Sequence, residues 1–336
     1  MTTLRLRPQK SQTSQKFIRK VNLRTDLAAL ADLIELAFAN VMDASGRGAI
    51  QELRALNAMG LGLVPLARFN GLASGISNGF VWEEDGKIVG NVSLYPAKLR
   101  SKQPSTWIVA NVATHPAYQR RGIAYELMQH SLRALKQEKI EVATLQVDYK
   151  NEGAQKLYAR LGFEYESAWK TWRRTYSHTS ARVTSDLYRA RSIKASEWEK
   201  EWEVVAQRRP NDKGGIGWMI PTELALIQPP FWKRVMNLLS LSQRQAYVSQ
   251  RIHSKKFESV LWAEKLFGYG YYKLTFFPSI IEEANESVLH YALSQHDDAS
   301  FIIEHPYFDV ETNRLLEDYR FKVNREMWHM TLNLKA

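Results

Sequence analysis

The sequence predicts an α+β fold with two tandem domains, each built on a twisted, mostly antiparallel sheet flanked by helices. Three observations support this prediction. Strand and helix patterns alternate between residues 79 and 175, the same order recurs about 158 residues later, and 336 residues suffice for two domains of roughly 150 residues each. We therefore expect a basic arm at 1–15, a first domain at 16–178 and a second domain at 185–336.

The first domain is expected to open with a strand and a capped helix. Phe17–Val21 has the composition of a strand, and Thr25 or Asp26 precedes an apolar series at helical spacing. Between residues 79 and 95, two apolar stretches flank a Glu-Asp-Gly sequence, which predicts a hairpin.

The later elements of this domain follow from apolar spacing. Trp107–Thr114 predicts a strand, and the next helix is expected to run from Gly122 to about Gln137. Its buried stripe comprises Ile123, Leu127, Met128, Leu132 and Leu135. The remaining elements are a strand at Val142–Asp148, a helix at Asn151–Leu161 with Gly162 as its C-terminal cap, and a β segment from Phe163 to about Thr175.

The second half repeats this order. The offset is 321 − 163 = 158, and it pairs Phe163 with Phe321, Leu157 with Leu315 and Asn151 with Asp309. Under the same offset the strand 142–147 falls on 300–305. An internal repeat of this length indicates two copies of one structural unit.

Composition narrows the class of protein. Hydrophobic residues make up 45% of the chain and charged residues 24%, and no apolar run reaches the roughly 18 residues of a membrane span. The N-terminus lacks the apolar core of a secretory signal, so we expect a cytoplasmic protein without a membrane partner. The absence of cysteine excludes disulfides, cysteine-ligated zinc and a cysteinyl intermediate.

The net charge of +11 is partly local, because seven Lys and Arg residues precede the first acidic residue, Asp26. A solvated tail is the simpler interpretation, and a handle for nucleic acid or ribosomes is the alternative. No zinc-finger spacing or RNA-binding aromatic motif supports that alternative. We expect no metal, since the histidines lack the i, i+4 spacing of a metal pair.

Two segments carry the chemical signature. From Val112 to Ala124 a strand runs into a basic turn with one glycine and then opens a helix. Such a turn offers free backbone N–H groups and a helix N-terminus to an anion. From Asn151 to Phe163 a short helix carries Tyr158, seven residues and two helical turns after Asn151 on the same face.

Together these segments resemble the acetyl-CoA-binding core of the GNAT (GCN5-related N-acetyltransferase) superfamily, in a tandem form. The resemblance implies that the pantetheine arm pairs with the strand and that the pyrophosphate lies over the turn. It also implies that Asn151 contacts the arm and that Tyr158 is the catalytic acid at the sulfur. The implied coenzyme-binding residues are Val112, Ala113, Thr114, Gln119, Arg120, Arg121, Gly122, Ile123, Ala124, Tyr125 and Asn151.

Both segments also allow plainer interpretations. The turn could be the ordinary start of a helix after a strand, and Tyr158 could pack beside Leu157 and Leu161. The general base is open as well, because Gln146 stands where related ribosomal-protein acetyltransferases place a glutamate. The remaining options are Asp148, Glu83, Glu84 and a water chain.

The second copy is expected to have lost this chemistry. Pro278–Glu283 stands where the first copy has its basic turn, without a glycine and with two carboxylates that would repel pyrophosphate. Leu316, the counterpart of Tyr158, cannot move a proton. We therefore expect one active site and one degenerate domain.

The resemblance favours an acetyl-CoA-dependent N-acetyltransferase in which a primary amine attacks directly in a ternary complex. The alternative is a non-catalytic CoA-binding sensor or scaffold. The acceptor would be a small-molecule or peptide amine, and residues 39–78 are expected to form its pocket. The sequence leaves the acceptor's identity and the oligomeric state open.

Overall fold

The computed structural model describes residues 16–39, 42, 44–58, 75–97, 104–175, 186–209, 221–231, 243–265, 270–296 and 298–335. The predicted arm, the stretch joining the predicted domains and residues 59–74 of the expected acceptor pocket lie outside these ranges. The chain divides into two compact units. The first unit comprises 1–96, 107–143 and 333–336, and the second comprises 97–106 and 144–332.

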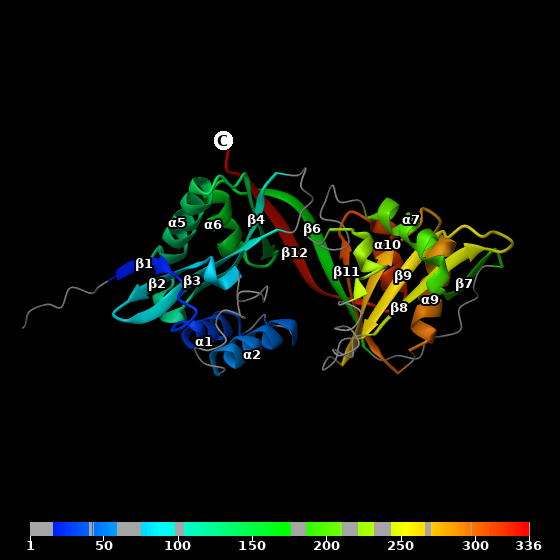
Figure 1. Cartoon of the computed structure of the whole chain (residues 1–336), viewed down its shortest axis with the longest axis horizontal. Coiled ribbons are helices and arrows are strands. Elements are labelled where there is room, and N and C mark those ends of the chain that lie inside the picture. The colour runs from blue at the N-terminus through cyan, green and yellow to red at the C-terminus, as the bar shows by residue number, and fades with distance from the viewer. Residues whose placement is uncertain are drawn as a thin grey trace, which may run out of the picture. The chain divides into compact units, whose positions relative to one another are not determined.

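In the first unit, four strands lie side by side in chain order, each antiparallel to the next (Figure 1). They are β1 (Lys16–Lys20), β2 (Phe80–Glu84), β3 (Lys87–Pro96) and β4 (Thr106–Thr114). The predicted hairpin is confirmed, and its turn places Asp85 and Gly86 at positive φ, as tight hairpin turns require. The helices are α1 (Leu27–Phe38), α2 (Ala44–Ala58) and α5 (Ile123–Gln137), with a 3-10 turn, η2 (Pro116–Tyr118).

The helices of this unit pack through apolar faces. α1 packs against α2 (Figure 1). Their buried residues form one cluster with Val81 of β2. α5 packs on β2 and β3. The five residues of its predicted stripe are all buried, so that prediction is confirmed. Asp26 occupies the N-cap position of α1, but its side chain makes no capping hydrogen bond there.

The second unit holds the rest of β5, which crosses the unit boundary, and a sheet in the order β5-β12-β6-β11-β10-β9-β8-β7. Its strands are β5 (Val142–Asp148), β6 (Glu164–Arg174), β7 (Tyr188–Ser192), β8 (Gln243–Arg251), β9 (Ser259–Lys265), β10 (Tyr271–Phe277), β11 (Ser300–Pro306) and β12 (Lys322–Asn333). The helices are α6 (Glu152–Arg160), α7 (Trp198–Arg208), α9 (Glu282–Ser294) and α10 (Val310–Asp318), with 3-10 turns η3 (Ala195–Glu197) and η5 (Leu224–Leu226).

The repeat seen in the sequence recurs in these elements. β5, α6 and β6 begin at residues 142, 152 and 164, and β11, α10 and β12 begin 158 residues later, at 300, 310 and 322. Asn151 and Asp309 cap the two helices alike, each accepting a hydrogen bond from the N–H three residues on at 3.1 Å. Gly162 ends α6 with φ +89°, and Arg320 takes the corresponding left-handed position after α10.

The last strands of the two copies are exchanged. β6 pairs with β11 of the second copy, while β12 lies between β5 and β6 of the first. Tyr149 N–H donates to Glu326 O at 3.1 Å, and Tyr307 N–H donates to Ala168 O at 2.9 Å. These two bonds are related by the same offset of 158. Each copy therefore completes its sheet with a strand from the other.

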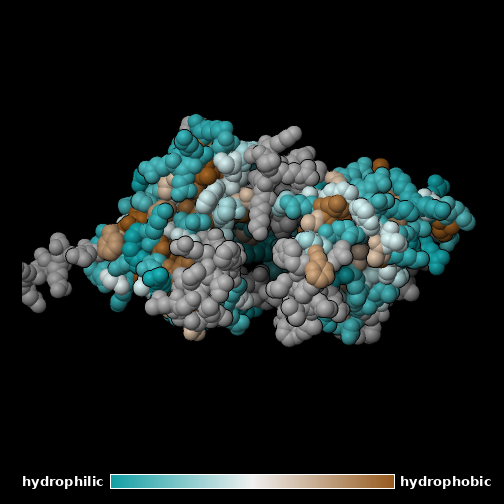
Figure 2. All heavy atoms as spheres, in the orientation of Figure 1, coloured by the Kyte–Doolittle hydropathy of each residue, from teal (hydrophilic) through white to brown (hydrophobic). Residues whose placement is uncertain are grey.

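A separate feature is the character of the surface. On the face in Figure 2, the described surface is mostly hydrophilic, with scattered apolar side chains. Among the described helices, none is long and apolar enough to cross a membrane.

Candidate functional site

β4 carries a bulge close to its end. The β3–β4 register shifts by one residue between the pairs Asn91↔Ala113 and Ser93↔Ala110. Asn111 lies in the bulge and has φ +49°. Asparagine tolerates this left-handed conformation better than most residues. The bulge interrupts the ladder within the strand predicted to hold a pantetheine arm.

A polar cluster surrounds the bulge. Asn91 donates from Nδ2 to Asn111 O at 2.9 Å, and Asn111 donates from Nδ2 to Ser93 Oγ at 3.2 Å and to Tyr95 Oη at 3.4 Å. Asn91 and Ser93 are fully buried. Burial raises the pKa of Tyr95 to about 12, so its phenol stays protonated at neutral pH.

Two buried oxygens in this part of the molecule lack a partner within the described residues. They are Asn91 Oδ1 in the polar cluster and Thr114 Oγ1 at the end of β4. Buried polar atoms are nearly always hydrogen-bonded in folded proteins. Unsatisfied oxygens beside a bulged strand therefore indicate a place where a ligand or water completes the hydrogen bonding.

The turn after β4 has an open, left-handed backbone. Arg120 has φ +63° and Gly122 has φ +82°, and Gly122 is the N-cap of α5 without any side-chain cap. A Cβ built on Gly122 would meet no atom within 4 Å. A helix N-terminus that follows a left-handed residue without a side chain is a backbone geometry that binds anions. Glycine both permits this φ and leaves room for a close approach.

The arginine side chains of the turn are less free than the sequence suggests. Arg121 donates to Glu84 Oε1 at 2.7 Å, and its guanidinium lies 5.0 Å from the ring centre of Tyr118. Glu84 therefore balances part of the charge of Arg121, whose side chain stays 40% exposed. Gln119 and Arg120 are exposed.

Asn151 and Tyr158 lie on α6, in the second unit. Asn151 is exposed, and its Oδ1 accepts the N–H of Ala154, so half of its amide serves as a cap. Tyr158 is buried and packs edge-to-face on Phe163 at 6.0 Å. Burial raises the pKa of Tyr158 to about 12, which keeps the hydroxyl protonated.

The carboxylates considered as general bases are each held by an arginine. Glu83 accepts from Arg19 at 2.8 Å, Glu84 from Arg121, and Asp148 from Arg325 at 3.0 Å. Each carboxylate is committed to an ion pair.

Gln146 joins a chain of polar side chains across three strands of the second unit. Its Nε2 lies 3.0 Å from His329 Nε2, and His329 Nδ1 lies 3.2 Å from Ser167 Oγ. His329 is fully buried, and burial lowers its pKa to about 3, so the ring is neutral. A neutral ring of such low basicity is a poor proton acceptor.

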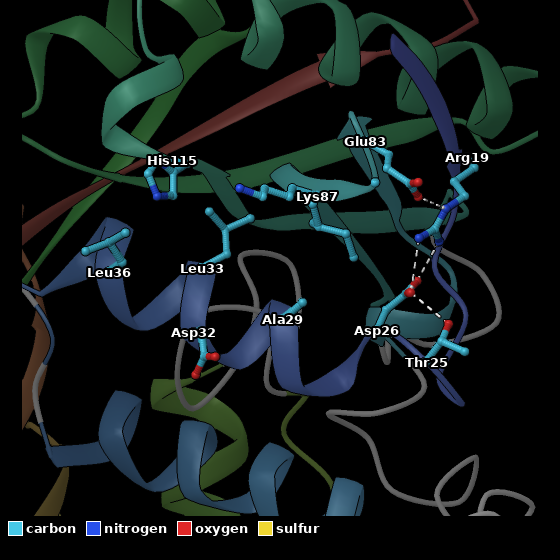
Figure 3. A pocket seen from close by; sticks show the side chains of 12 residues that line it. Arg19, Thr25, Asp26, Ala29, Asp32, Leu33, Leu36, Glu83, Lys87 and His115 are labelled. Carbon is cyan, nitrogen blue, oxygen red and sulfur yellow. Dashed lines mark hydrogen bonds and ion pairs between the residues drawn. The ribbon is translucent and has the colours of Figure 1, made fainter. Parts of the chain in front are cut away.

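A pocket of about 590 Å³ lies in the first unit between α1 and the β2–β3 hairpin (Figure 3). At one end Arg19 binds Asp26 through two hydrogen bonds of 2.6 and 3.1 Å and also binds Glu83. Burial alone would raise the pKa of Asp26, but the bonds from Arg19, the Asn22 N–H and Thr25 lower it below its usual value.

At the other end of the pocket, the Lys87 ammonium points toward His115 (Figure 3). The lining includes none of the predicted coenzyme-binding residues. One lining residue, His115, directly follows Thr114, so the pocket borders the strand end described above.

The sequence analysis missed the polar cluster at the bulge, namely Asn91, Ser93, Tyr95 and Asn111. A signal for it was present. Asn91 and Ser93 alternate through an otherwise apolar strand, on the face where a core strand would carry hydrophobic residues. Polar side chains on one face of a buried strand require partners there, and this requirement points to a site.

Comparison with known proteins agrees with this geometry. The model of the acetyltransferase (GNAT) family matches residues 66–163. A tandem GNAT protein from the clavulanic acid biosynthesis pathway has 12% identity and a TM-score of 0.60, over 95% of this chain and 99% of that chain. A GCN5-related N-acetyltransferase from Sphaerobacter thermophilus has 12% identity and a TM-score of 0.64, over 95% and 96% of the two chains.

A GCN5-related N-acetyltransferase from Anabaena variabilis has 15% identity and a TM-score of 0.53, over 95% of this chain and 73% of that chain. No curated protein matches the chain. The family match lies on the segment that contains the bulged strand and the open turn, and the structural matches share the two-copy fold. Residues 66–163 thus match the GNAT acetyltransferase family, and the fold of the chain is similar to that of solved GNAT proteins, one of them a tandem GNAT protein.

Proposed function

We propose that this protein is an acetyl-CoA-dependent N-acetyltransferase with one active site, in the first copy of the repeat. The observation that carries the proposal is the left-handed turn at Gly122 before α5, where an added Cβ would meet no atom within 4 Å. The family match of residues 66–163 supports acetyl transfer in general, and the turn supports this copy as the one that binds the coenzyme.

The residues of the first unit fit such a coenzyme. The N–H groups of residues 120–125 would hold its pyrophosphate, since a helix N-terminus and a left-handed turn both favour anions. Backbone groups of Val112, Ala113 and Thr114 would pair with the amides of the pantetheine arm. The unsatisfied oxygens of Asn91 and Thr114 would accept hydrogen bonds from groups bound beside the bulge.

Bound acetyl-CoA supplies a thioester that an amine can attack. Tyr158 is the proposed proton donor to the departing sulfur, because its buried hydroxyl stays protonated far above neutral pH. We propose no dedicated carboxylate base, because Glu83, Glu84 and Asp148 are each ion-paired. The amine must then reach the site already deprotonated or lose its proton to water.

The direct test is calorimetric titration with acetyl-CoA, comparing wild type with Gly122→Val. Gly86→Val is a matched control, because Gly86 also has positive φ (+76°) and open space around it but lies at the hairpin turn. Both variants should lose stability through backbone strain of about 1–3 kcal/mol. Only Gly122→Val should lose acetyl-CoA affinity, by roughly tenfold or more, which corresponds to at least about 1.4 kcal/mol.

Turnover is then tested with a panel of amines by release of free thiol from acetyl-CoA. Thiol release that depends on one amine class would identify the acceptor. Failure of the wild type to bind acetyl-CoA would overturn the proposal. Binding without turnover across the panel would instead favour the CoA-binding sensor or scaffold.

A further inference from the structure

In the second copy, two parallel strands separate at the place where the family fold holds pantetheine. β10 and β11 pair only from Tyr271↔Ser300 to Leu274↔Ile303, although β10 continues to Phe277 and β11 to Pro306. Beyond that point each strand pairs with its outer neighbour, β10 with β9 and β11 with β6. The ends of β10 and β11 therefore border a gap of their own.

The side chain of Arg209 bridges this gap. Arg209 follows α7, and its Nη2 donates to Phe276 O of β10 at 3.3 Å and to His305 Nδ1 of β11 at 3.2 Å. The guanidinium carbon lies 5.5 Å from the ring centre of Trp169 on β6. Phe276 O is a backbone acceptor on a separating strand, the kind of group that a pantetheine amide would otherwise engage.

A further hydrogen bond anchors this arrangement. His305 is fully buried, and its Nε2 lies 2.7 Å from Asp309 Oδ2. Because burial lowers the pKa of His305, the ring is neutral, accepts from Arg209 at Nδ1 and donates to Asp309 at Nε2. Asp309 is the counterpart of Asn151, which is expected to contact the coenzyme arm in the first copy. In the second copy this position instead binds His305.

The turn of the second copy is closed independently. Ser279 N–H donates to Asn285 Oδ1 at 2.7 Å, and Ile281 N–H donates to Ser279 Oγ at 3.2 Å. In the first copy the N-cap residue of the corresponding helix is Gly122, which has no side chain to cap the turn. Glu282 and Glu283 then occupy the first turn of α9 and disfavour an anion there.

We propose that Arg209 fills, from within the chain, the groove that the second copy would otherwise offer to a pantetheine arm. Arg209, His305 and Asp309 form an internal plug, and together with the self-capped turn they leave one acyl-CoA site per chain. This inference concerns the second copy and does not depend on whether the first copy is catalytic.

The test compares the full-length wild type with Arg209→Ala by thermal unfolding with and without D-pantetheine, which carries no phosphate. Arg209→Ala should melt several degrees lower, and millimolar pantetheine should raise its melting temperature by several degrees more than it raises that of wild type. Any contribution of the first copy cancels in this difference. Arg209→Lys, which keeps the charge and much of the length, serves if Arg209→Ala does not fold, and it should show a smaller shift of the same sign.

If pantetheine raised the melting temperatures of the wild type and of the folded variant equally, the proposed plug would be wrong. So would calorimetry showing two acetyl-CoA molecules bound per wild-type chain. The absence of any acetyl-CoA binding by wild type would overturn the proposed function instead. In that case the difference in pantetheine shifts would still decide whether Arg209 fills a groove.

Discussion

The two copies of the repeat share their elements but treat their polar groups in opposite ways. In the first copy Gly122 precedes α5 without a side-chain cap, and buried oxygens near the bulge lack partners within the described residues. In the second copy side chains cap the turn, and Arg209 bridges the separated strands. The contrast is confined to the turn and the strand ends, because Arg209 Nε and Ser249 Oγ of the second copy are also buried without a partner within the described residues.

This contrast separates fold from function. The helix cap, the spacing of the last three elements and the exchanged pairing are the same in both copies. What differs is a handful of side chains: Asn151 against Asp309, Tyr158 against Leu316 and Gly162 against Arg320. The topology is thus compatible with either role, and specific groups decide the chemistry.

The largest expected effect comes from deleting β12, the second-copy strand that lies between β5 and β6. Deleting residues 322–336 takes away the partners of Thr144, Gln146 and Asp148 on β5 and one neighbour of β6. We expect the loss of cooperative unfolding, measured by circular dichroism in urea. Deleting residues 1–15 is the control and should leave unfolding unchanged. A cooperative transition in the 322–336 deletion would show that the exchange is dispensable.

A second prediction concerns the acid. Tyr158→Phe should lower kcat for thiol release by about 10²–10³-fold, in the range that general acids contribute. The affinity for acetyl-CoA should stay within about twofold, because the ring and its packing remain. The control is Tyr165→Phe, an exposed tyrosine on β6. An unchanged kcat for Tyr158→Phe, with chemistry rate-limiting, would leave Tyr158 a packing residue.

We also expect stability to depend on pH through His329 of β12. His329 has a folded-state pKa of about 3, below its ordinary value of 6.5, because burial disfavours the charged ring. Unfolding therefore takes up a proton below pH 6.5, and the stability present above that pH is lost as pH falls toward 3. The loss should reach about 1.4 kcal/mol per pH unit.

His329→Gln isolates this contribution. Between pH 7 and pH 5 the unfolding free energy of wild type, measured in urea, should fall by about 2 kcal/mol more than that of the variant. The other histidines are common to both proteins and cancel in the comparison. Parallel pH curves would contradict a neutral, buried His329.

The smallest expected effect comes from exchanging the caps. Asn151→Asp should keep α6 capped, since Asp caps as well as Asn, but place a negative charge near the proposed coenzyme arm. Acetyl-CoA affinity should fall by about tenfold, or about 1.4 kcal/mol, with little change in melting temperature. Asp309→Asn should do the reverse. It should lower the melting temperature, because it weakens the Asp309–His305–Arg209 contacts, and it should leave the affinity for acetyl-CoA unchanged. Calorimetry and thermal unfolding of both variants separate the two outcomes.

Local patterns predicted the elements well. The buried stripe of α5, the hairpin and the left-handed Gly162 all follow from apolar spacing and turn chemistry, and the structure confirms them. The limits of the predicted domains stay a prediction. The two compact units are divided differently, with one division inside β5.

Features that depend on distant neighbours were missed. β6 and β12 occupy equivalent positions in their copies. The sequence pattern therefore fits pairing within a copy as well as exchange between copies. Arg209 follows a helix of ordinary amphipathic character, and nothing local marks it as the residue that bridges β10 and β11. The bulge at Asn111 could have been suspected from Asn91 and Ser93, whose polarity on a buried strand required partners.

The strand exchange has a consequence for synthesis of the chain. β6 ends at residue 174 and β12 begins at residue 322, so 322 − 174 = 148 residues separate β6 from its partner. At about 5–20 residues per second, the ribosome needs roughly 7–30 s to bridge that distance. During this time the strand that bears Trp169 and Trp172 has an open edge, the kind that pairs with other chains. Crowded translation of this protein should therefore be most prone to aggregation before β12 emerges.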